Sequence, residues 1–157
     1  MNVRQASIRW LGSLGVLGVV GWVGAHASSA SVVTSDFSLD PRLESELWCA
    51  EPQVVDPVGL AFAADGTAYV AECRDYPYGA GPSGRPGSTI RRLSDTDGDG
   101  RPDRSTLFAT DLSYATSVLS WRDGVLALAP PEIVFLQDVD GDGRADRRTV
   151  VLRGLGL

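Results

Sequence analysis

The apolar residues of this chain fall in short runs separated by Gly, Pro and Asp, a pattern typical of strands joined by turns. No stretch after residue 45 shows a convincing helical pattern. We therefore predict strands at 46–50, 57–62, 67–73, 88–93, 105–112, 115–121, 125–130, 132–137 and 148–155. Asp65-Gly66 is typical of a hairpin turn between two of them.

The pattern is an internal repeat. Residues 90–114 and 133–157 share 12 identical residues in 25 aligned positions, with a period of 43 residues from Asp95 to Asp138. A unit of four strands and this length is the size of one β-propeller blade, roughly 40–50 residues. We predict an all-β fold in which residues 46–157 form about two four-stranded antiparallel β-propeller blades. Blade 1 would occupy about 56–112 and blade 2 about 113–157.

A propeller closes with about four to eight blades. We therefore expect the chain to be the N-terminal part of a larger protein, an incomplete propeller, because two blades alone leave open edges and an unfinished interface. The alternative is a small, self-contained eight-stranded β-domain.

The N-terminus has the three parts of an export signal. A short cationic region precedes the apolar run Trp10 to Ala25, and Ala25-His26-Ala27 has the form of a cleavage site. We predict a signal peptide at 1–27, followed by a polar, Ser-rich linker at 28–45. An uncleaved membrane anchor is the alternative. Either way the chain is exported, to the periplasm or the extracellular space.

Charge and cysteine content narrow the functional classes. With 20 acidic and 14 basic residues, the chain lacks the basic balance of a nucleic-acid-binding protein. Export favours a disulfide between the two cysteines, Cys49 and Cys73, and two buried free thiols are the alternative.

Two Asp-rich loops, 95–103 and 138–146, share the spacing D-x-D-G-D-G-x-x-D. Clustered carboxylates repel one another unless a cation neutralises them, and hard oxygen ligands suit calcium. We predict two structural calcium sites, with Arg101 and Arg144 contributing backbone carbonyls. The carboxylate ligands would be Asp95, Asp97, Asp99, Asp103, Asp138, Asp140, Asp142 and Asp146.

These loops differ from EF-hands. The bidentate Glu at position 12 is replaced by Thr106 or Thr149, and the flanking segments are predicted strands. Loss of that Glu predicts weak affinity, on the order of 10⁻⁴–10⁻³ M. The alternative interpretation is a pair of solvated polar hairpin turns.

The order of motifs gives a family resemblance. "EPQVVDPVGLAFAADGTAYVAECRDYP", "IRRLSDTDGDGRPDRSTLFATDL" and "DGVLALAPPEIVFLQDVDGDGRADRRTVVLRGLG" together resemble the opening of a membrane-bound dehydrogenase domain family. That family is abundant in exported proteins of planctomycetes and verrucomicrobia. The resemblance covers about residues 46–157.

The resemblance implies a propeller similar to NHL and soluble quinoprotein glucose dehydrogenase folds. Such dehydrogenases use a histidine base and pyrroloquinoline quinone to oxidise a sugar or alcohol. The only histidine here, His26, lies in the predicted signal, so no catalytic residue is carried over. In a full-length protein the quinone and the small-molecule substrate would depend on further blades.

Residues near the end of the third predicted strand are candidates for the ligand face. Glu72, Arg74, Asp75 and Tyr76 precede a long Gly/Pro-rich connection, a composition that suits a functional loop. The alternative is structural: Arg74 and Asp75 form a surface ion pair, and Tyr76-Pro77 packs the loop.

Three functions remain open on the sequence. The chain is part of an exported quinone- or cytochrome-linked dehydrogenase without turnover of its own, a non-catalytic calcium-stabilised binding or adhesion propeller, or a remnant without function.

Overall fold

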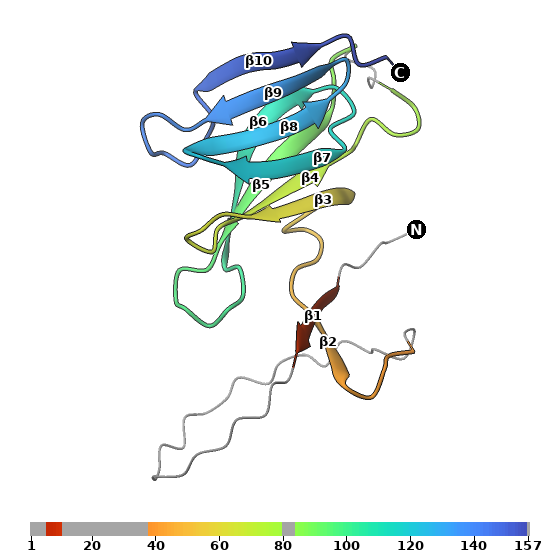
Figure 1. Cartoon of the computed structure of the whole chain (residues 1–157), viewed down its shortest axis with the longest axis vertical. Coiled ribbons are helices and arrows are strands. Elements are labelled where there is room, and N and C mark those ends of the chain that lie inside the picture. The colour runs from red at the N-terminus through yellow and green to blue at the C-terminus, as the bar shows by residue number, and fades with distance from the viewer. Residues whose placement is uncertain (1–5, 11–37, 80–83, 157) are drawn as a thin grey trace. The chain divides into compact units, whose positions relative to one another are not determined.

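The computed structural model describes residues 6–10, 38–79 and 84–156 (Figure 1). The chain forms two units. Residues 5–48 form one unit, whose described part is the antiparallel pair of β1 (Ala6–Trp10) and β2 (Leu43–Leu47). Most of the predicted signal peptide and linker therefore lies outside the described residues. No helix among the described residues is long and apolar enough to span a membrane.

The second unit holds two four-stranded antiparallel sheets, and the predicted all-β class is confirmed. Sheet 1 consists of β3 (Pro57–Phe62), β4 (Ala68–Glu72), β5 (Ser88–Ser94) and β6 (Arg104–Leu112). Sheet 2 consists of β7 (Ser117–Trp121), β8 (Gly124–Ala129), β9 (Glu132–Gln137) and β10 (Arg147–Arg153). In both sheets each strand pairs with the next along the chain. Sheet 1 falls within 56–112 and sheet 2 within 113–157.

One predicted strand is displaced. The expected strand at 46–50 is β2, which spans Leu43–Leu47 and ends before Cys49. The reason is local: the Gln53 N–H donates to the Ala50 carbonyl at 2.9 Å and closes a turn that contains Pro52. The other eight predicted strands each coincide with an observed strand within two residues at either end.

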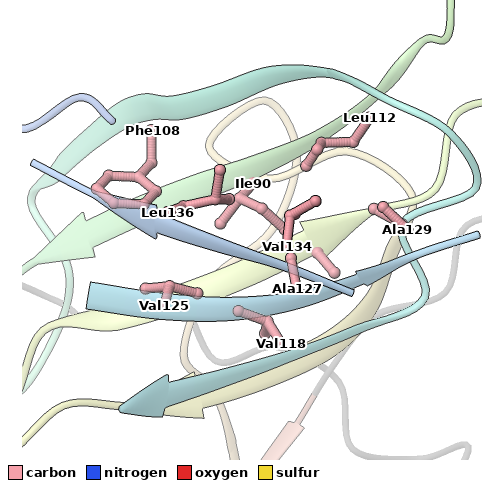
Figure 2. Packing of buried hydrophobic residues seen from close by; sticks show 11 residues of the cluster. Ile90, Phe108, Leu112, Val118, Val125, Ala127, Ala129, Val134 and Leu136 are labelled. Carbon is pink, nitrogen blue, oxygen red and sulfur yellow. The ribbon is translucent and has the colours of Figure 1, made fainter. Parts of the chain in front are cut away.

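The main core lies between the two sheets (Figure 2). Each sheet presents alternate residues to the other, as the two-residue period of a strand requires. Sheet 1 contributes Ala71, Ile90, Phe108 and Leu112, and sheet 2 contributes Val118, Val125, Ala127, Ala129, Val134 and Leu136. Tyr69 packs edge-on against Phe108, with ring centroids 5.0 Å apart.

The first strands of the two sheets approach closely because β3 carries a glycine there. A Cβ atom at Gly59 would lie 3.3 Å from the Ser117 Cα and 3.3 Å from the Thr116 carbonyl oxygen. A larger residue would push β3 and β7 apart, so Gly59 fixes how tightly the inner edges of the sheets can pack.

The opposite face of sheet 1, called here its outer face, is covered by residues 49–56, called here the cap. The Ser105 Oγ–H donates to the Gln53 carbonyl at 2.8 Å, and the Gln53 amide donates to the Pro102 carbonyl at 3.1 Å. Cys49 and Val54 of the cap are buried. Beneath it, the outer-face residues Ala68, Val70, Glu72 and Leu93 are also buried.

Candidate functional site

The first Asp-rich loop is the hairpin between β5 and β6. Asp95 accepts two backbone hydrogen bonds within it, from Gly98 at 2.6 Å and from Gly100 at 2.7 Å. Both glycines have left-handed φ angles, +81° and +86°. The N–H groups of Gly100 and Gly98 hold the pKa of Asp95 below its ordinary value because they stabilise the carboxylate.

The second loop, between β9 and β10, repeats this geometry. Asp138 accepts from Gly141 at 2.7 Å and from Gly143 at 2.9 Å, and those glycines have φ angles of +81° and +90°. The sequence repeat is therefore also a repeat of backbone conformation and hydrogen bonding.

Three of the four predicted carboxylates converge in each loop. One oxygen atom from each member of a trio lies within 4.8 Å of the others; the trios are Asp95, Asp97 and Asp99 in loop 1, and Asp138, Asp140 and Asp146 in loop 2. Such oxygen clusters have the chemistry that calcium prefers. Strands flank both loops, which is inconsistent with an EF-hand.

The remaining aspartate of each loop supports the turn. The Thr96 hydroxyl donates to Asp103 at 2.6 Å, and the Arg144 N–H donates to Asp142 at 2.8 Å. Asp146 has both roles, because it also accepts from the Val139 N–H at 2.8 Å.

The surroundings of the loops differ. Loop 2 rests on sheet 1: the Ala145 N–H donates to the Phe108 carbonyl at 2.8 Å, and Gly143 is buried against Arg92. Loop 1 rests instead on the cap, through the hydrogen bond between Gln53 and the carbonyl of Pro102. Its residues 95–101 are exposed.

Glu72, a candidate for the ligand face, is fully buried and holds the cap to sheet 1. Its carboxylate accepts hydrogen bonds from the Val55 N–H (2.9 Å), Arg91 Nε (2.8 Å), Thr89 Oγ1 (2.7 Å) and Arg74 Nη2 (2.9 Å). Burial raises the pKa of Glu72, but the hydrogen bonds from Thr89, Arg91 and Val55 outweigh it, and the net pKa lies below the ordinary value.

Asp75 is also buried, and it joins three segments. It accepts from the backbone N–H groups of Gly87, Ser88 and Tyr114, and from the Ser88 hydroxyl at 2.9 Å. Burial raises the pKa of Asp75, yet the hydrogen bonds from Tyr114, Gly87 and Ser88 bring the net pKa below its ordinary value. Asp75 thereby ties the connection after β4 to the link between the sheets.

The other two ligand-face candidates are more accessible. The Arg74 side chain is 38% exposed and pairs with Glu72, not with Asp75 as in the alternative ion pair considered for the sequence. Tyr76 is 76% exposed, and nearby Tyr78 is 94% exposed. Residues 80–83 of this connection lie outside the described residues.

Cys49 and Cys73 are both buried free thiols. The Cys49 thiol donates to the Gln53 side-chain oxygen at 3.5 Å, and burial raises the pKa of the Cys49 thiol. The structure thus has the pair as thiols, the alternative to the predicted disulfide.

Sequence reasoning missed the partners of Glu72. Thr89 and Arg91 both lie on the neighbouring strand β5: Thr89 pairs directly with Glu72, and Arg91 is two residues further along that strand. Their spacing along the chain carries no motif. Charged residues inside an otherwise apolar strand were the available signal, because a buried charge needs a partner.

Comparison with known proteins gives a family. The sequence profile of a domain of unknown function, DUF7133, matches residues 29–157, and the chain belongs to this family. No curated protein and no solved structure matches the chain.

Proposed function

We propose that the chain is an exported, calcium-stabilised β-propeller module whose two sheets are neighbouring blades. Each Asp-rich loop would bind one calcium ion with a structural role. The observation that carries this proposal is the convergence of three carboxylates in each loop, in two loops with the same backbone conformation and hydrogen-bonding pattern.

Three features support the blade assignment. The sheets are consecutive four-stranded meanders, they repeat in sequence, and they share one core with their faces opposed. Their first strands, β3 and β7, approach closely at Gly59, as expected for the strands nearest a propeller axis.

The calcium ions would hold the last hairpin of each blade. Bound cations would offset the repulsion among carboxylates that lie within 4.8 Å of one another. An affinity on the order of 10⁻⁴–10⁻³ M is expected, because strands replace the second helix and the bidentate Glu of an EF-hand. Such weak sites would fill only where free calcium is high, which agrees with an exported protein.

Thermal unfolding with and without calcium tests the proposal. At 10 mM calcium each site should add roughly 1.4–2.7 kcal/mol to the free energy of unfolding, from RT ln(1+[L]/Kd) with the affinities above. Asp97→Asn and Asp140→Asn should each remove part of this gain, and the double variant should remove all of it. Asn keeps the hydrogen-bond acceptor of Asp97 and Asp140 but loses the charge.

Asp123→Asn is the matched control, because Asp123 lies outside both loops and accepts a hydrogen bond from the Gln137 side chain. It should leave the calcium response unchanged. A calcium response that survives in the double variant would contradict the assignment of these loops.

A role in an oxidoreductase is the second candidate, favoured by the order of motifs that resembles a membrane-bound dehydrogenase family. In that case pyrroloquinoline quinone and a sugar or alcohol would bind with residues beyond this chain, and the blades here would be structural. Sugar or alcohol oxidation with added quinone and calcium should then show no turnover for the 157-residue chain. Turnover would contradict this division of roles.

A further inference from the structure

The two sheets differ in which face is covered. Register places the side chains of sheet 2 that do not face sheet 1 on a surface called here the open face. Its apolar residues on β7, β8 and β9 are Leu119, Trp121, Leu126, Leu128, Ile133 and Phe135, and the polar Ser117 and Gln137 share this face. Leu119 is 56% exposed and Trp121 41% exposed, and the other four apolar residues are half-buried. A contiguous apolar surface across three strands is typical of an interface.

The repeat identifies the equivalent face of sheet 1. Ile133 and Phe135 align with Ile90 and Arg92, and Leu128 aligns with Ala71 through its pairing with Ile133. Ala71 and Ile90 are fully buried, because sheet 2 covers them. The open face of sheet 2 is therefore the continuation of an interface that already exists between the sheets.

The outer face of sheet 1 lacks the composition for such an interface. Glu72 and Arg91 stand where sheet 2 has Ala129 and Val134, two residues of the main core. A packed apolar sheet would leave the Glu72 carboxylate without its backbone donor, at a large cost in desolvation. The cap instead provides that donor, the N–H of Val55, and Arg91 pairs with Glu72.

The cap also contacts loop 1 in the way that sheet 1, the preceding sheet, contacts loop 2. Loop 2 docks on sheet 1 through Ala145, and the aligned residue of loop 1, Pro102, docks on the cap through Gln53. On this side the edge strand β3 lies beyond the cap, and its Val58, Leu60 and Phe62 form an apolar stripe one strand wide.

From these observations we infer that the module is one-sided. The cap closes sheet 1, and the open face of sheet 2 docks one further four-stranded sheet of the same repeat, with small and branched side chains on its contacting face. A second copy of this chain fits less well, because its own face of that kind, with Val118, Ala127 and Val134, is already buried against sheet 1. The inference rests on the proposed assignment of the two sheets as neighbouring blades. It departs from a closed ring at sheet 1, where the cap lies in place of a preceding blade, and it is independent of calcium.

A fusion tests the docking. A second copy of residues 113–156 is joined after Leu155, the position that aligns with Leu112 at the end of sheet 1. The appended copy carries Trp121→Phe, so that the Trp121 of the receiving sheet is the one tryptophan at the new contact. The other three, Trp10, Trp22 and Trp48, are common to the fusion and the 157-residue chain. We expect the emission of Trp121 to shift to shorter wavelength relative to the 157-residue chain, and the fusion to unfold in a single transition at higher temperature.

Two matched variants of the receiving chain test the sidedness. Leu119→Arg on the open face should abolish the emission shift, whereas Val58→Arg on the outer side of β3 should leave it intact. Both positions are about half exposed, at 56% and 50%, so neither change should unfold the 157-residue chain. Loss of the shift with Val58→Arg as well would overturn the one-sided arrangement.

A fusion without the emission shift, including one whose appended copy stays unfolded, would overturn the docking, because the receiving sheets are already formed.

Hydrogen exchange tests the cap separately in the 157-residue chain. The amides of Val55 and Cys73 donate to Glu72 and Asp56, and they should exchange slowly, together with sheet 1. Fast exchange there beside a protected sheet 1 would refute the cap. Calcium titration of the fusion is a separate measurement. A calcium response without the emission shift would count against the docking alone, and an emission shift without a calcium response would count against the metal sites alone.

Discussion

Sheet 1 and sheet 2 are copies of one repeat, but they treat corresponding positions in opposite ways. In sheet 2, Ala129 and Val134 face the other sheet and join the core. In sheet 1 the corresponding Glu72 and Arg91 face away from the core and form an ion pair at 2.8 Å, in which Glu72 is fully buried and the Arg91 side chain is 17% exposed. Two substitutions thus change a surface that packs on a sheet into a surface that binds an irregular segment.

In the proposed one-sided module, Glu72 and Arg91 would end the array of sheets at sheet 1 without a separate domain. Apolar faces accept almost any well-shaped apolar partner, whereas a buried charge pair accepts only groups that complete its hydrogen bonds. The cap supplies such groups from its backbone. The asymmetry of the module therefore depends on polar residues, although most of its buried surface is apolar.

The strongest test of this comparison is Glu72→Ala. It leaves Arg91, whose side chain is only 17% exposed, without its partner and removes the acceptor for Val55 and Thr89, so we expect a loss of about 3–5 kcal/mol in the free energy of unfolding. Urea unfolding measures it. Glu132→Ala is the control: Glu132 also pairs with two arginines, Arg148 and Arg153, but these are exposed, and a loss of about 0–1 kcal/mol is expected. Equal losses would show that Glu72 has no special role.

The different settings of the two loops can be tested with an aligned pair of glycines. Gly100→Ala and Gly143→Ala both force a side chain into a left-handed conformation, at about 1–2 kcal/mol each. A Cβ atom at Gly143 would also lie 3.3 Å from Arg92 Nη1, whereas a Cβ atom at Gly100 would meet no atom within 4 Å beyond its chain neighbours in the described part of the chain. Gly143→Ala should therefore cost up to about 1 kcal/mol more in urea unfolding. The opposite order would contradict the docking of loop 2 on sheet 1.

The buried acids predict how acid destabilises the module. The pKa values of Glu72 and Asp75 are lower in the folded chain than their ordinary values of 4.5 and 3.8. Their stabilising contribution is therefore fully present above those ordinary values and is lost as the pH falls through the lower, folded pKa values. Glu72→Gln should flatten the fall in unfolding free energy below about pH 4.5, and Asp75→Asn should flatten its lower part. Parallel pH profiles for Glu72→Gln and the unmodified chain would contradict this.

Much of the fold could be predicted from the chain alone. Alternating apolar residues and Asp-Gly turns located eight strands of the two sheets to within two residues of their observed ends. The Asp-rich spacing located both loops between strands. It did not show which three carboxylates converge, because that depends on side-chain directions that differ between Asp99 and Asp142.

For the ligand-face candidates, the sequence did not predict which side chains are buried. A charged residue at the end of a strand looks the same whether it faces solvent or the interior. Burial of Glu72 and Asp75 depends on segments 17 and 39 residues away, at Val55 and Tyr114. Tyr76, in contrast, is exposed.

The sequence by itself determined the strands, the turns and the repeat, because those follow from local backbone preferences and from a two-residue period. Only the tertiary structure decided which face of each sheet is covered and which acids are buried. A strand carries two faces of side chains, and what lies over each face is a matter of contacts between residues far apart in the chain.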